Sequence, residues 1–182
     1  RRTGELVAKL GLSKPVFRLR LGPSIFHALV GWGFLSFLLI NLADLIYAFT
    51  NFKLLEHLGF FGDVYRLIAD VANVLILVGI LAMVIRRFIL RPATLSTRET
   101  TLLHPKARFG ILRDSAIVAT FIIVHNTARL LGESFYVAET GYDRWQPFIS
   151  AVAGLWSGAE AGVLLAGERL MFWLSIGAVV AF

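Results

Sequence analysis

The sequence predicts an all-α, polytopic membrane protein: a four-helix bundle with a short interfacial helix before the last span. Apolar residues make up 57% of the 182 residues and charged residues only 16%, against roughly 45–50% and about 25% in an ordinary soluble domain. Long apolar runs alternate with blocks of basic residues. The chain has no cysteine, which excludes disulfides, thiolate catalysis and an iron–sulfur cluster ligated by these residues.

Four apolar stretches are long enough to cross a membrane. A helix rises about 1.5 Å per residue and the hydrocarbon layer is ~30 Å thick, so a span needs about 20 residues. The stretches are Ser24–Ala48, Leu67–Val84, Ser115–Leu131 and Ala161–Phe182. A shorter apolar segment, Trp145–Trp156, opens with a glutamine and a proline. It is predicted to lie in the outer interface, with its two tryptophans at headgroup depth.

The basic residues predict the orientation of the chain. They outnumber acidic residues six to one in residues 1–22 and seven to two in the loop 85–114 between the second and third spans. By the positive-inside rule, both segments are expected on the cytoplasmic side of a prokaryotic-type inner membrane. Four spans then return the C-terminus to the cytoplasm. The same basic blocks indicate anionic lipid as a partner rather than nucleic acid.

Two regions follow from these patterns. Residues 1–22 are interpreted as a basic cytoplasmic or interfacial segment, in which an amphipathic surface helix would be broken at Pro15. Residues 23–182 are interpreted as the transmembrane domain. Its last span ends in three apolar residues, 180–182, without a lysine, arginine, tryptophan or tyrosine to anchor it. We therefore expect the transmembrane domain to continue beyond Phe182.

His27 is the first candidate ligand. It lies in the first turn of the first span, where a neutral imidazole can be an axial ligand of haem iron. Gly31 and Gly33 follow about one turn later, and small residues let a flat macrocycle or a neighbouring helix approach closely. The alternative is a histidine that extends to the cytoplasmic headgroups. His57 and His104 are interpreted as solvated loop residues, because loops offer no fixed ligand geometry.

A second group of polar residues lies in the outer half of the predicted bundle. The members are Asp44, Asp70, His125, Arg129 and Glu168, with Asn41, Asn73, Glu133 and Arg169 beside them. Residues three or four apart share a helix face, so each span can direct its set inward. One interpretation is a proton path or quinone site, and the other is a set of ion pairs that hold the helices together.

His125 is also weighed as a haem ligand. At about 1.5 Å per residue, it lies ~18 Å from the cytoplasmic end of its span, against ~5 Å for His27. Two axial ligands of one iron are only ~4 Å apart. The two histidines are therefore not expected to bind the same haem, and a bridge between helices or a proton relay stays open for His125.

Two segments resemble a known family. Pro23–His27, which runs on into Gly31–Phe34, and the basic, proline-terminated Arg86–Pro92 are similar to the membrane b-type cytochrome subunit of respiratory nitrate reductase. They resemble even more closely the membrane domain of heterodisulfide-reductase-like iron–sulfur oxidoreductases. The resemblance implies a four-helix haem core that exchanges electrons between a cytoplasmic iron–sulfur module and membrane quinone, as one component of a multi-subunit complex rather than a complete enzyme.

The resemblance also implies particular ligands. His27 matches the cytoplasmic-side ligand of a b-type haem, whose partner would fall roughly ten residues, or ~15 Å of helix, beyond Phe182. Phe37 and Ser175 match the two ligands of an outer haem, and neither side chain can bind iron. One haem b is therefore expected, with the iron–sulfur donor in another subunit or in a further C-terminal domain. The alternative is a haem-free anchor or assembly subunit of a respiratory or photosynthetic complex.

Overall fold

The computed structural model describes residues 21–50, 52–95 and 104–182, and this part of the chain is all-α. Its four long helices are α3 (Leu21–Thr50), α5 (Phe60–Val84), α6 (Pro105–Thr140) and α8 (Ala161–Ala181). Each is long and apolar enough to cross a membrane. The predicted four-helix architecture is confirmed, and the chain is a multi-pass membrane protein. The amphipathic helix expected near the N-terminus falls on residues outside the described ranges.

Short elements connect the four spans. α4 (Leu54–His57) precedes α5, and a π-helical turn, Ile85–Leu90, ends α5. The predicted interfacial helix is also present, as α7 (Pro147–Ala153) followed by the 3-10 turn Gly154–Trp156. Trp156 packs on α6, because its indole N–H donates a 2.9 Å hydrogen bond to the Ser134 hydroxyl and its ring stacks on Phe135 at 4.4 Å. The 3-10 turn therefore attaches the C-terminal end of α7 to α6.

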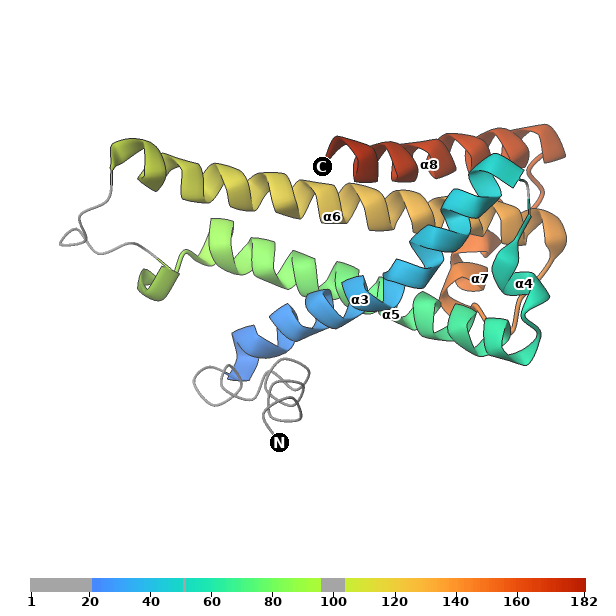
Figure 1. The fold of residues 1–182 in the computed structure, drawn as a ribbon, viewed down its shortest axis with the longest axis horizontal. Coiled ribbons are helices and arrows are strands. Elements are labelled where there is room, and N and C mark those ends of the chain that lie inside the picture. The colour runs from blue at the N-terminus through green and yellow to red at the C-terminus, as the bar shows by residue number, and fades with distance from the viewer. Residues whose placement is uncertain (1–20, 51, 96–103) are drawn as a thin grey trace.

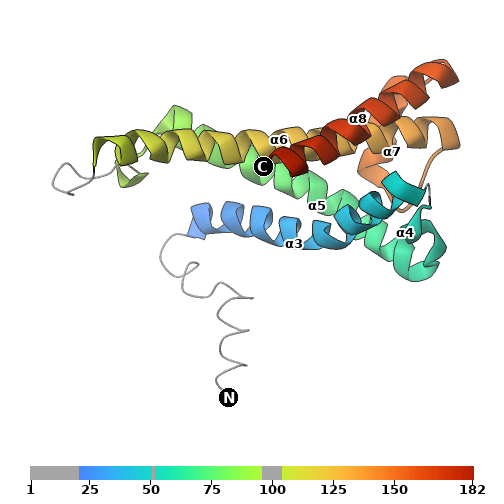
Figure 2. The same ribbon diagram turned by 45° about the horizontal axis from the view of Figure 1, so that its top comes forward.

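The spans form two helix pairs. α3 crosses α5, and α8 runs along the C-terminal half of α6, while α5 and α6 lie lengthwise beside each other (Figure 1). α4 and α7 lie together at one end of the bundle, where α3 and α6 end and α5 and α8 begin (Figures 1 and 2). At the opposite end, the first turns of α3 lie away from the α6–α8 pair (Figure 2).

Glycines set the contact between α3 and α5. A Cβ at Gly33 would overlap the side chain of Ile76, and a Cβ at Gly79 would come within 3.1 Å of the Phe26 carbonyl oxygen and the Val30 side chain. The absence of side chains lets the two backbones approach closely. Of the two possibilities raised for Gly33, the structure shows the close approach of a neighbouring helix.

The buried core is small and lies inside the bundle. Phe37, Ala72 and Ile76 form one cluster, and Ile40, Ala43, Leu55 and Ala69 form another nearer to α4. Many large apolar side chains face outward, including Leu38, Phe49 and Trp173. Such extensive apolar exposure suits a surface covered by lipid or other subunits.

Candidate functional site

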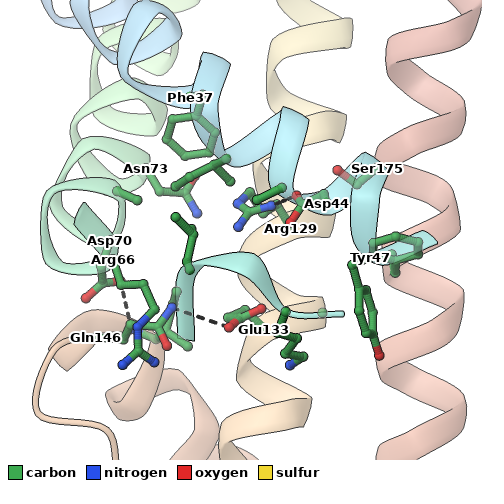
Figure 3. Close-up of a pocket in the computed structure, with 18 of the residues that line it drawn as sticks. Phe37, Asp44, Tyr47, Arg66, Asp70, Asn73, Arg129, Glu133, Gln146 and Ser175 are labelled. Atoms are coloured by element: carbon green, nitrogen blue, oxygen red, sulfur yellow. Dashed lines mark hydrogen bonds and ion pairs between the residues drawn. The ribbon is translucent and has the colours of Figure 1, made fainter. Parts of the chain in front are cut away.

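A polar cavity lies within the bundle at the end where α4 and α7 are found (Figure 3). Helices α3, α5, α6 and α8 all contribute to its wall, and α4 covers part of it. About 90 Å³ of this space is open to the centre of a water molecule, which is room for several waters. Four of the five residues predicted to form an inward polar layer line it: Asp44, Asp70, Arg129 and Glu168. The fifth, His125, does not line it.

Asp44 and Arg129 form an ion pair across the cavity, which joins α3 to α6 (Figure 3). Their side chains are only 22% and 15% exposed. The Arg129 guanidinium also lies 5.6 Å from the centre of the Phe37 ring, within the range of a cation–π contact. A charged pair at membrane depth needs such partners, because an isolated charge there is costly.

Asp70 has a structural role that the sequence did not reveal. Its buried carboxylate accepts hydrogen bonds from the backbone N–H groups of Phe148, at 2.7 Å, and Ile149, at 3.1 Å. These are the first N–H groups of α7, which have no partner within their own helix. Pro147 occupies the first position, where a missing N–H costs nothing. Asp70 therefore fixes α7 to α5.

Arg66 ties the loop before α7 to α5. Its guanidinium forms 2.7 Å hydrogen bonds with Asp63 on the same helix and with Asp143 in that loop. Asp143 also accepts from the backbone N–H of Trp145 at 2.8 Å. The sequence did not reveal this network, because Arg66 and Asp143 are 77 residues apart.

Lys53 lines the cavity beside α4. Its ammonium nitrogen lies 2.9 Å from the centre of the Tyr136 ring and 5.4 Å from that of Tyr47. The Tyr136 hydroxyl in turn donates a 3.1 Å hydrogen bond to Glu56, which lies 3.8 Å from Lys53. Sequence reasoning missed this group too, since a cation above an aromatic ring has no signature in residue spacing.

Two amide side chains direct unpartnered oxygens into this region. Asn73 and Gln146 line the cavity and are only 2% and 5% exposed. The Gln146 amide N–H donates to Glu133 at 3.4 Å, but its oxygen and that of Asn73 have no hydrogen-bond partner among the described residues. Buried acceptors of this kind normally bind water or a ligand.

His125 lies next to the cavity and bridges α6 and α8. Its Nδ1 is 3.0 Å from the hydroxyl and 3.2 Å from the carbonyl oxygen of Ser175. Its ring also stacks on Phe121 with centroids 5.9 Å apart. The geometry is that of the interhelical bridge considered from the sequence. Ser175 and Phe37, the positions matched to outer-haem ligands, both face the same cavity.

His27 has a different setting. It is exposed, whereas Phe26, Val30 and Gly33 of the same helix contact α5. No hydrogen bond or ion pair joins its imidazole to another described residue. Gly31, one turn further along, has no heavy atom within 4 Å of the position of a Cβ. The position of a Gly31 side chain beside His27 is therefore free of other described residues.

Comparison of the chain with family models, with curated proteins and with solved structures gives no match in any of the three. What the fold and the geometry define is a class of protein. It is a four-span membrane protein with a polar cavity towards one end of the bundle and an accessible imidazole on the first span towards the other.

Proposed function

We propose that the chain is a membrane electron-transfer subunit or domain that carries one b-type haem near the cytoplasmic face. It passes electrons between a cytoplasmic iron–sulfur module and membrane quinone. The observation that supports this best is the state of the His27 imidazole, which has no partner among the described residues although it stands in a membrane span.

The other three histidines are engaged locally. His57 Nδ1 lies 2.9 Å from the Lys53 carbonyl oxygen, and its ring packs on a phenylalanine. His104 accepts from the backbone N–H of Lys106 at the start of α6, and His125 bridges two helices. A polar group left unpaired in a membrane is costly. Binding of haem iron by the His27 imidazole would offset that cost.

The surface around His27 suits a flat apolar group. Gly31, Phe34 and Leu38 follow it on the exposed side of α3, so an open position and apolar side chains adjoin the imidazole. Bound haem would supply one-electron chemistry, which links a one-electron iron–sulfur donor to a quinone. We propose a second histidine, from a segment after Phe182 or from a partner subunit, as the opposite ligand. α8 runs towards the end where α3 begins (Figure 1), so a continuation of it would approach the level of His27.

The proposed orientation rests on basic residues at that same end. Arg86, Arg87 and Arg91 follow α5, and Lys106 and Arg113 lie in the first turns of α6. With this end in the cytoplasm of a prokaryotic-type inner membrane, His27 lies near the face at which an iron–sulfur partner docks.

The test is haem content in native membranes. Reduced-minus-oxidised spectra and pyridine haemochrome assays are recorded for the intact protein and for His27→Ala, with His57→Ala as the matched control on an exposed histidine. We expect the b-type signal to disappear only in His27→Ala. His27→Met retains a ligand and should keep haem with an altered spectrum. If His27→Ala is present at normal levels with an unchanged haem signal, the proposal is wrong.

A second candidate is a haem-free anchor or assembly subunit. It is favoured by α8, whose most apolar 18-residue window is only 11% buried, and by the outward-facing Trp173 and Val180 on that helix. Such a face suits packing against other subunits. The absorption spectrum of the purified complex distinguishes the two candidates, because a haem-free anchor shows no haem band.

A further inference from the structure

The cavity beside α4 and α7 is lined by eight charged side chains. Five carboxyl side chains and three basic side chains line it: Asp44, Glu56, Asp70, Glu133 and Glu168, with Lys53, Arg66 and Arg129. Ionisable groups at membrane depth are tolerated where they face each other or a water-filled space. Hydrogen bonds and ion pairs among the described residues account for part of this set only, since Glu168 has no hydrogen bond to another described residue.

The unpartnered acceptors indicate what fills the space. The amide oxygens of Asn73 and Gln146 are buried, face the cavity and lack a donor among the described residues. The Arg66 Nε–H at the same site is a buried donor that lacks an acceptor there. Water can pair with both kinds of group, because it donates and accepts hydrogen bonds. The cavity has room for several water molecules.

Burial shows which way the cavity opens. Five residues of its wall are at most 2% exposed: Phe37, Ile40, Asp70, Asn73 and Ala128. Towards α4 the lining becomes accessible, with side chains of Lys53 and Glu56 that are 22% and 35% exposed. The accessible part of the wall thus lies at the end of the bundle at which α4 is found, and the most buried part lies further inside.

We propose that this cavity is a water-filled vestibule that admits protons and other small cations from the α4–α7 end of the bundle to the level of Arg129. Carboxyl groups outnumber basic groups in the wall by five to three, and a cleft with an excess of one charge concentrates ions of the opposite sign. The vestibule does not depend on the proposed haem, which would lie at the other end of the molecule.

The chain lacks cysteine, so single cysteines report accessibility directly. Ala128→Cys and Ala43→Cys place a thiol in the cavity wall on two different helices. Ala119→Cys is the matched control, because Ala119 is also a buried alanine of α6 but lies outside the cavity. Sealed membranes of either orientation are exposed to Ag⁺, a small thiol-reactive cation, and remaining thiols are counted with a maleimide in detergent.

We expect Ag⁺ to protect both cavity thiols when added on the α4–α7 side, and to leave the Ala119→Cys thiol available. Glu168→Gln in the Ala128→Cys background should slow protection by about threefold to tenfold, as for one charge removed at ~12 Å or more at an effective permittivity of ~20. Glu139→Gln, an exposed residue outside the cavity, should not.

Several results would overturn the vestibule. Cavity thiols that react in detergent but never with Ag⁺ would show a dry interior. If Ag⁺ protected the cavity thiols only when added on the opposite side, the proposed position of the opening would be wrong. Equal protection of the Ala119→Cys thiol would show that Ag⁺ reaches buried thiols by a route other than the cavity. Protection by a membrane-soluble maleimide alone would show that lipid, not water, reaches the site. None of these readouts involves haem, so they fail or succeed separately from the electron-transfer proposal.

Discussion

Gly33 on α3 lies directly against Ile76 on α5, in a position where any Cβ would overlap the isoleucine side chain. Gly31, only two residues earlier, has open space where its Cβ would be. The two glycines were treated alike from the sequence, but they face different surroundings. Gly33 sets the helix contact, and Gly31 belongs to the open surface beside His27.

Leucine should therefore affect stability at Gly33 and not at Gly31. Gly33→Leu is expected to lower stability by about 1–3 kcal/mol, the usual cost of overpacking, measured by thermal unfolding in detergent. Gly31→Leu should leave the unfolding temperature unchanged. If haem binds beside His27, Gly31→Leu should instead lower haem content. Equal destabilisation by the two substitutions would contradict the packing described here.

Asp70→Ala should loosen α7. The variant loses the carboxylate that accepts from the N–H groups of Phe148 and Ile149, and loss of such a cap costs about 0.5–2 kcal/mol. Hydrogen exchange at these two amides should accelerate, while amides in the middle of α6 should not change. Asp114→Ala, at an exposed carboxylate, is the control. Unchanged exchange at both amides would mean that Asp70 does not hold the helix.

The spans could be predicted from the sequence, but their ends could not. The third predicted span, Ser115–Leu131, is the middle of α6, which extends from Pro105 to Thr140. Apolar content marks only the part of a helix that crosses hydrocarbon. Apolar content does not predict where a helix ends, because lysine, arginine and glutamate are good helix formers in water and the helix can continue into charged residues.

The convergence of the polar residues could be predicted because it follows from helical periodicity. Spacing of three or four residues placed Asp44, Asp70 and Arg129 on inward faces, and the structure brings them to one cavity. Their partners could not be predicted. Asp70 contacts Phe148, 78 residues away, and Lys53 lies over Tyr136. Such contacts depend on which helix faces which, and residue spacing carries no information about that.

The Asp44–Arg129 pair should contribute to stability mainly through the cost of breaking it. Asp44→Ala leaves a guanidinium buried without its partner, which is expected to cost about 3–5 kcal/mol. Asp44→Ala combined with Arg129→Met should cost less than the sum of the two single variants, measured by unfolding in detergent. The exposed Arg113–Asp114 pair is the comparison, and its disruption should cost about 0–1 kcal/mol. Strict additivity at Asp44 and Arg129 would argue against a direct pair.

The hydrogen bond between His125 and Ser175 allows a test of whether His125 has a structural role or binds iron. Ser175→Ala removes the hydroxyl 3.0 Å from His125 Nδ1 and is expected to destabilise the α6–α8 contact by about 1 kcal/mol, the usual net worth of one hydrogen bond. Haem content measured by pyridine haemochrome should stay at the level of the unmodified protein in both Ser175→Ala and His125→Gln, because neither residue adjoins His27. Loss of the haem signal in His125→Gln, with the protein still present in the membrane, would move the iron from His27 to the middle of α6.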